Sequence, residues 1–197
     1  MQDMTDNNNR AVFCEHGALS SMPNVEQLSR LIRDIPDFPK PGVVFKDITP
    51  ILADPAALPL AIESLTRPFC DQAVDIVVGP ESRGFIFATA AAQGLSAGFV
   101  PIRKPGKLPC KTKKIEYELE YGTDALEIHE DAIRPGMRVL LMDDLLATGG
   151  TMSACCELVK LLRGEIVGAA FLIELCFLHV RQKLEGIPIH SVSKVES

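Results

Sequence analysis

The sequence predicts an α/β protein with a doubly wound, mostly parallel sheet. Apolar, β-branched stretches such as residues 74–79 and 139–142 are typical of buried strands. Each is followed by a short polar loop and then by a segment whose apolar residues recur at helical spacing. Strands that alternate with helices, without an internal repeat, indicate a parallel sheet between helical layers. The chain has 197 residues, of which 47% are hydrophobic, which suffices for one domain with a substantial core.

Composition and charge exclude several classes of protein. A net charge of −6 and a pI near 5.3 argue against a nucleic-acid binder, which usually carries a basic face. No apolar run is long enough to cross a membrane, and the N-terminus lacks an apolar signal core. We therefore expect a cytoplasmic protein without nucleic-acid or membrane partners. The cysteines form no C-x-x-C and no histidine pair has metal-ligand spacing, so no resident metal is predicted.

The N-terminal part divides into three segments. Residues 1–21 are polar and aperiodic, which predicts a disordered extension before a single domain over residues 22–197. Val25, Leu28, Ile32 and Ile35 then recur at helical spacing, so we expect a helix that ends at Pro36. Residues 36–50 contain several prolines, which exclude a regular helix and predict a stiff loop. Its apolar side chains suit either a slot for a flat base or a lid packed on the domain.

The next unit combines a strand, a loop and a helix. Asp54 and Pro55 are typical of a helix start, and the strand over residues 74–79 leads into P-E-S-R-G and a helix over residues 85–93. Arg83 offers a planar fork of donors, and the helix start adds main-chain donors. The loop therefore favours an anion, although Arg83 could instead pair with Glu81.

A basic segment follows the third strand, which we expect over residues 97–102. It contains Arg103, Lys104 and Lys107 and lies at a strand end beside the other loops. Its cations could close over a polyanionic ligand, or they could form an ordinary solvated loop. Residues 115–121 and 126–129 alternate apolar and acidic side chains, which predicts a two-stranded flap.

The most informative stretch is V-L-L-M-D-D-L-L-A-T-G-G-T over residues 139–151. It predicts a buried strand, an acid pair at its end, a glycine loop and a helix start. Unpaired N–H groups at the helix start, glycines that permit close approach and two threonine hydroxyls suit a phosphate. Asp143 and Asp144 can accept hydrogen bonds from a diol, so together the parts describe a site for ribose 5-phosphate. The stretch is neither a Walker A nor a G-x-G-x-x-G motif. An ordinary turn with a solvated acid pair is the alternative.

The last part of the chain predicts a strand over residues 168–175, a short helix over 180–184 and a short strand over 187–191. We assign this tail no chemistry.

The stretch at residues 139–151 resembles the phosphoribosyl pyrophosphate (PRPP) signature of type I phosphoribosyltransferases. Its sequence is similar in particular to that signature in the adenine phosphoribosyltransferases. The resemblance extends over residues 25–175 and includes residues 39–49, 78–85, 103–109 and 119–128. It implies the type I phosphoribosyltransferase fold, with a hood at about residues 36–50 and a flexible loop at about 103–121. The implied reaction is purine salvage, in which adenine and PRPP give AMP and pyrophosphate through an oxocarbenium-like transition state. Mg²⁺ carried by PRPP and a homodimer are also implied.

The resemblance also implies residue roles. Glu120 and Arg83 are the catalytic candidates. The residues implied to bind the ribose phosphate are Asp143, Asp144, Ala147, Thr148, Gly149, Gly150 and Thr151. The residues implied to bind the pyrophosphate are Glu81, Ser82, Arg83, Arg103, Lys104, Lys107 and Tyr121. A cis peptide bond between Glu81 and Ser82 is also implied. The main chain at Val44 and Lys46, together with Leu175, is implied to bind adenine.

Two other functions fit parts of the pattern. A phosphoribosyltransferase for a 6-oxopurine or a pyrimidine would offer a lysine or another donor to the ring oxygen. Adenine needs an acceptor there, which the side chain of Lys46 cannot be. A regulator that senses PRPP without catalysis would need a DNA-binding head and a basic face, and neither is visible in this acidic chain.

Overall fold

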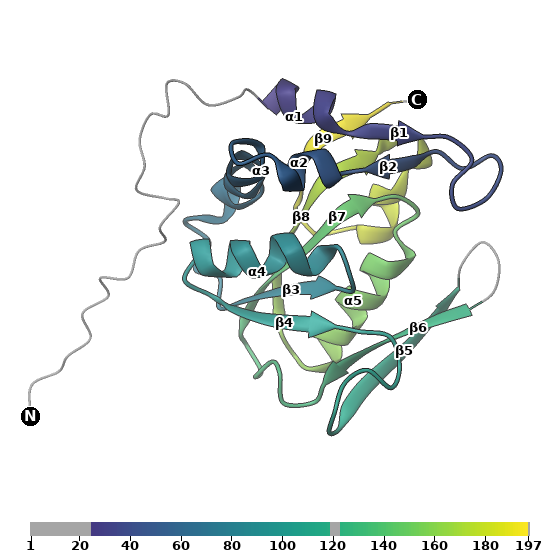
Figure 1. Cartoon of the computed structure of the whole chain (residues 1–197). Coiled ribbons are helices and arrows are strands. Elements are labelled where there is room, and N and C mark those ends of the chain that lie inside the picture. The colour runs from purple at the N-terminus through teal and green to yellow at the C-terminus, as the bar shows by residue number, and fades with distance from the viewer. Residues whose placement is uncertain (1–24, 119–122, 197) are drawn as a thin grey trace, which may run out of the picture.

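The computed structural model describes residues 25–118 and 123–196 and contains a central five-stranded sheet in the order β4-β3-β7-β8-β9 (Figure 1). All four neighbouring pairs are parallel. The strands are β3 (Ile76–Pro80), β4 (Gly98–Ile102), β7 (Arg138–Leu146), β8 (Glu165–Leu175) and β9 (Ile189–Val195). The predicted doubly wound parallel sheet is therefore confirmed.

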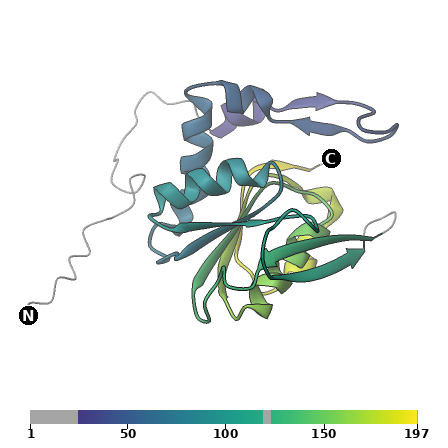
Figure 2. The same ribbon diagram turned by 60° about the horizontal axis from the view of Figure 1, so that its bottom comes forward.

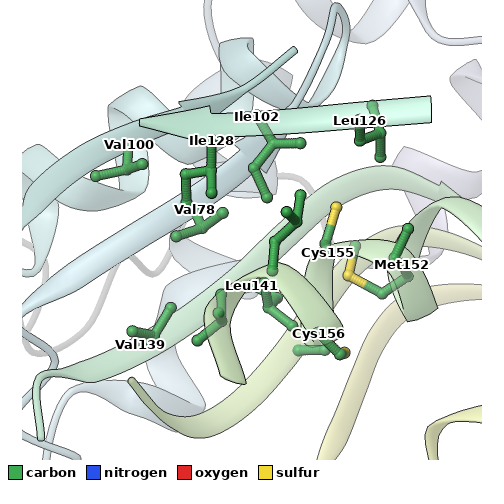
Figure 3. Packing of buried hydrophobic residues seen from close by; sticks show 14 of the residues in the cluster. Val78, Val100, Ile102, Leu126, Ile128, Val139, Leu141, Met152, Cys155 and Cys156 are labelled. Carbon is green, nitrogen blue, oxygen red and sulfur yellow. The ribbon is translucent and has the colours of Figure 1, made fainter. Parts of the chain in front are cut away.

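Helices cover both faces of this sheet. One face carries α3 (Ala57–Thr66) and α4 (Gly84–Gly94), with the shorter α1 (Val25–Leu31) and α2 (Thr49–Ala53) beside them. The other face carries α5 (Gly150–Leu161). Since successive residues of a strand point to opposite faces, the sheet strands contribute side chains to two hydrophobic cores, one on each face. In β7, Leu140 and Met142 pack toward α3 and α4, whereas Val139 and Leu141 pack toward α5. Figure 3 shows Leu141 among Val78, Met152 and the two adjacent cysteines of α5.

The predicted flap is confirmed as an antiparallel pair, β5 (Thr112–Glu118) and β6 (Thr123–His129). Leu126 and Ile128 of β6 are buried in the core on the α5 side (Figure 3). A second antiparallel pair, β1 (Arg33–Ile35) with β2 (Phe45–Asp47), forms a hairpin in the hood. Figures 1 and 2 show the hairpin and the flap on opposite sides of the carboxyl ends of the sheet strands.

Two predictions near the hairpin are wrong. The first helix ends at Leu31, because residues 33–35 pair with β2 and are held there by ion pairs from Arg33 to Asp47 and from Lys46 to Asp34. These tertiary contacts override the helical spacing of Ile32 and Ile35. Residues 36–50 are also not entirely loop, since they contain β2, which pairs with β1, and the start of α2.

Smaller differences concern the ends of elements. Strand β7 continues through the acid pair to Leu146, because β8 pairs with it as far as Glu174. The tail contains the 3₁₀ helices η2 (Cys176–Leu178) and η3 (Val180–Leu184), and a third, η1 (Arg67–Phe69), follows α3. The predicted disordered extension, residues 1–21, lies outside the described residues, as do Glu120 and Tyr121. Within the described ranges, no helix has the length and apolar character needed to cross a membrane.

The strand order creates one switch point. From β3 the chain winds outward to β4 at one edge, and from β7 it winds through β8 to β9 at the other. The loops that follow β3 and β7 therefore diverge between neighbouring parallel strands. In open α/β sheets, a crevice at such a point is where ligands bind.

Replacing Leu141 by alanine should test the core. Leu141 is fully buried, so Leu141→Ala should lower the free energy of unfolding by about 2–5 kcal/mol, through lost burial and the cavity left behind. Leu161→Ala is the matched control, because that leucine is 52% exposed and its loss should cost less than about 0.5 kcal/mol. Urea unfolding of both variants measures the difference, and equal losses would contradict the packing.

Candidate active site

A pocket of about 260 Å³ opens at the switch point between β3 and β7. Two loops that are about 60 residues apart in the sequence form its walls. Its lining residues are Glu81, Ser82, Arg83, Asp143, Asp144, Leu145, Leu146, Ala147, Thr148, Gly149, Thr151 and Met152. Gly150, which was also predicted for this site, is the first residue of α5. Leu145, Leu146 and Met152 were not predicted, because their apolar pattern signals only burial.

The loop after β7 presents its main chain to the pocket. Gly149 has φ +77°, a conformation that side chains disfavour, and it precedes α5 directly. The first N–H groups of a helix have no partner within the helix, and the helix dipole adds positive charge at this end. The 12-residue helix α5 therefore begins with donors for an anion, and Thr151 adds a hydroxyl group in its first turn.

The acid pair lies between the two loops. Asp143 Oδ1 accepts a hydrogen bond of 2.9 Å from the main-chain N–H of Asp144. A Cβ atom on Gly84 would come within 2.8 Å of Asp143 Oδ1, so only glycine allows the loop after β3 to approach this closely. Desolvation raises the pKa of Asp143 well above its ordinary value, and the neighbouring charge of Asp144 adds to the effect. Burial also raises the pKa of Asp144, against the opposing charge of Arg83.

Arg83 lines the pocket and connects the acid pair to the hood. Its Nε atom is 2.9 Å from Asp144 Oδ2, and its guanidinium carbon lies 4.9 Å from the centre of the Phe45 ring in the hood. Its Nη1 atom is buried and has no hydrogen-bond partner among the residues that the structure describes. A buried guanidinium donor without an acceptor is costly, so a ligand with anionic oxygens would satisfy it.

Glu81 gathers the basic segment at the rim of the pocket. Its carboxylate accepts hydrogen bonds from Arg103 Nε (3.2 Å) and Nη2 (3.1 Å), from Lys107 Nζ (3.0 Å) and from the N–H of Lys104 (3.0 Å). Burial opposes the ionised form, but these donors lower the pKa of Glu81 overall. The alternative pairing of Arg83 with Glu81 is therefore wrong. Glu81 lines the pocket and holds Arg103, Lys104 and Lys107 beside it, although these three residues do not line the pocket themselves.

Two further features complete the rim. The peptide between Glu81 and Ser82 is cis, as the family resemblance implies. Lys104 Nζ lies 3.0 Å from Asp124 Oδ2 of the flap, and Tyr117 Oη lies 3.4 Å from both that atom and Thr151 Oγ1. Through Tyr117 the flap thus contacts Thr151 in the first turn of α5. The sequence analysis did not single out Tyr117 or Asp124. Their alternating pattern gave no chemical signal.

The structure does not bring the predicted adenine residues into this pocket. Val44 is 52% exposed in the hood, and the side chain of Lys46 pairs with Asp34 at 2.7 Å. Leu175 ends β8 and packs beside the core on the α3 side. The hood reaches the pocket instead through Phe45, whose ring meets Arg83. Glu120 and Tyr121 belong to residues 119–122, which are not described.

Neutralising Asp143 should stabilise the protein without ligand. A carboxyl group whose pKa is raised by folding destabilises the fold once the pH exceeds the ordinary value near 3.8, because the unfolded chain then releases the proton more readily. Asp143→Asn should therefore raise the free energy of unfolding at pH 7, and the gain should shrink as the pH approaches 4. Urea unfolding at both pH values measures the gain, with the exposed Asp131→Asn as control. A loss of stability that is equal at both values would refute the raised pKa.

Comparisons with known proteins agree with this geometry. Residues 56–185 match the family model described as the phosphoribosyl transferase domain. The adenine phosphoribosyltransferase of Rhodopirellula baltica is 52% identical over 183 residues, which cover 91% of this chain and 89% of that protein.

Solved structures give the same result. The crystal structure of adenine phosphoribosyltransferase from Rhodothermus marinus matches with a TM-score of 0.84 and 54% identity, covering 87% of this chain and 98% of that one. The enzyme from Saccharomyces cerevisiae, complexed with D-2,5-dideoxy-2,5-imino-altritol 1,6-bisphosphate and adenine, matches with a TM-score of 0.81 and 39% identity, covering 85% and 97%. The chain therefore belongs to the adenine phosphoribosyltransferases of the phosphoribosyl transferase family, the purine salvage enzymes that convert adenine and PRPP to AMP and pyrophosphate.

Proposed function

We propose that the pocket between β3 and β7 is where PRPP binds and where adenine displaces its pyrophosphate. One observation carries this assignment: Arg83, whose buried Nη1 donor has no partner among the described residues, and the start of α5 line the same pocket as two carboxyl groups. Two anion sites separated by acceptors for a diol match the two phosphate ends of PRPP and the ribose between them.

The loop after β7 gives the substrate its orientation. Ala147, Thr148, Gly149, Gly150 and Thr151 hold the 5-phosphate through main-chain and hydroxyl donors. Asp143 and Asp144 accept hydrogen bonds from the ribose hydroxyls. Binding of the 5-phosphate, remote from the reacting carbon, then fixes that carbon relative to the base and the leaving group.

The loop after β3 receives the pyrophosphate. Ser82 and Arg83 line the pocket, and Arg103, Lys104 and Lys107 are held beside it by their contacts with Glu81. For the lysines and Arg103 to meet the pyrophosphate, they must give up part of their contact with Glu81. Glu81 then acts by positioning these cations, since its carboxylate would repel the anion directly.

Charge explains the chemistry. The bond from the ribosyl carbon to pyrophosphate breaks before much bonding to the purine nitrogen has formed, so positive charge develops on the ring. Asp143 and Asp144 place negative charge beside that ring, and Arg83 with the rim cations stabilises the departing anion. The catalytic pair of this proposal is Arg83 for the leaving group and Glu120 for the purine proton.

Mg²⁺ belongs to this proposal as a companion of the substrate. Among the residues that the structure describes, no cluster of three or more His, Cys, Asp and Glu side chains could hold a metal ion. The pocket carboxylates are already engaged with Arg83 and a main-chain amide. They fit an ion that arrives on phosphate and ribose oxygens and retains its waters. When bound, Mg²⁺ would neutralise charge on the pyrophosphate.

The base site lies toward the hood. The main chain at Val44 and Lys46 supplies a donor and an acceptor suited to the adenine edge, and Leu175 supplies an apolar wall. Phe45, in contact with Arg83, links this site to the pocket. We also propose that the enzyme works in the cytoplasm, and that it forms a homodimer, as the family resemblance implies.

A panel of bases tests the substrate assignment. With PRPP and Mg²⁺ present, adenine should give AMP, while guanine, hypoxanthine and uracil should give little nucleotide, because their ring oxygen needs a donor where adenine needs an acceptor. Chromatography of the products measures this. Guanosine or inosine monophosphate as the main product would reject the choice of adenine.

Loss of the Arg83 side chain should slow turnover strongly. Arg83→Ala should lower kcat by roughly 10²-fold, because one charged donor to the leaving group is removed. Arg134→Ala is the matched control, since that exposed arginine lies at the opposite end of β7 and should leave kcat unchanged. Steady-state rates of AMP formation compare the two, and a wild-type rate for Arg83→Ala would remove that residue from the mechanism.

A further inference from the structure

The C-terminal 3₁₀ helix η3 lies directly behind the loop proposed to hold the 5-phosphate. In Figure 1 the yellow-green segment after β8 returns beside the start of α5. Lys183 Nζ donates a hydrogen bond of 2.9 Å to the main-chain oxygen of Thr148. Ser153 Oγ of α5 lies 3.5 Å from the main-chain oxygen of Lys183. The tail is thus joined once to the loop and once to the first turn of α5.

The Lys183 contact controls one peptide group of the loop. In a trans peptide the C=O and N–H groups point in opposite directions. With the oxygen of Thr148 held from behind by Lys183, the N–H of Gly149 points away from Lys183. Gly149 lines the pocket, so this is a donor that a bound phosphate can use. A cation on the carbonyl also polarises the peptide and strengthens its N–H as a donor.

Val180 supports the same peptide from below. It is 2% exposed, and a Cβ atom on Gly149 would lie only 2.3 Å from its Cγ2 atom. The valine therefore fills the space beneath Gly149 and prevents the loop from sinking away from the pocket. Close packing of this kind transmits position, because interiors resist compression.

An ion pair between the buried Glu174 and the half-exposed Arg181 anchors η3. Glu174, near the end of β8, is 2% exposed and accepts two hydrogen bonds from Arg181, at 2.6 Å from Nε and 2.7 Å from Nη2. These bonds lower the pKa of Glu174 against the effect of burial. A bidentate pair fixes orientation as well as distance. Through Arg181, the central sheet therefore sets where Val180 and Lys183 stand.

We propose that Lys183 is a positioning residue for the 5-phosphate of PRPP, acting through the Thr148–Gly149 peptide. This inference rests on the proposed function of the loop. Lys183 lies behind the loop and orients its donor, and its charge adds to the positive end of α5. The side chain should matter for ligands that carry a 5-phosphate and not for pyrophosphate, which the loop after β3 receives.

Binding of two separate ligands tests this proposal. Lys183→Met should weaken the binding of ribose 5-phosphate by roughly 5- to 10-fold, the effect expected for one hydrogen bond from a charged group at an exposed site. The binding of pyrophosphate with Mg²⁺ should not change. The KM for PRPP should rise by a similar factor with little change in kcat, and Lys183→Arg should restore most of the loss. Isothermal titration calorimetry and initial rates measure these quantities.

The control is Lys160→Met, which removes an exposed lysine from the last turn of α5, at the end far from the loop, and should change neither ligand. Wild-type affinity of Lys183→Met for ribose 5-phosphate, or equal weakening for both ligands, overturns the positioning role. A wild-type protein that binds neither ribose 5-phosphate nor PRPP instead overturns the proposed function, so the two failures are distinct.

Discussion

The site depends on how closely the loop after β3 approaches the acids of β7. Gly84 makes this approach possible, since any side chain there would strike Asp143. The contact brings Arg83 against Asp144 and places both beside the start of α5. Parallel strands alone put the two loops at the same edge of the sheet. The missing Cβ atom decides that they form one pocket rather than two separate turns.

This closeness leaves charges incompletely matched in the protein without ligand. The acid pair is desolvated and has raised pKa values, while Arg83 keeps a buried donor without an acceptor among the described residues. Such groups cost stability, and sites that bind charged ligands commonly retain them. Glu81 has a different role, because its carboxylate accepts hydrogen bonds from Arg103 and Lys107 and so holds both cations beside the pocket.

The C-terminal tail contacts the loop after β7 and supports it from outside the pocket. Glu174 carries a buried charge at the end of β8, and Arg181 is its partner. The pair ties η3 to the sheet, and η3 in turn lies against Gly149 and Thr148. A segment without a chemical motif thus supports the residues that have one. The tail contributes through its position in the fold and not through a recognisable sequence motif.

The sequence by itself determined the alternation of strands and helices, the flap and the two loops of the pocket, because hydrophobic period and glycine placement are local properties. Only the tertiary structure decided that Ile35 lies in a strand, that Arg83 pairs with Asp144, and that Lys183 reaches Thr148. Each of these depends on contacts between residues distant in the chain. Spacing cannot encode such contacts, since they arise only when the sheet has been assembled.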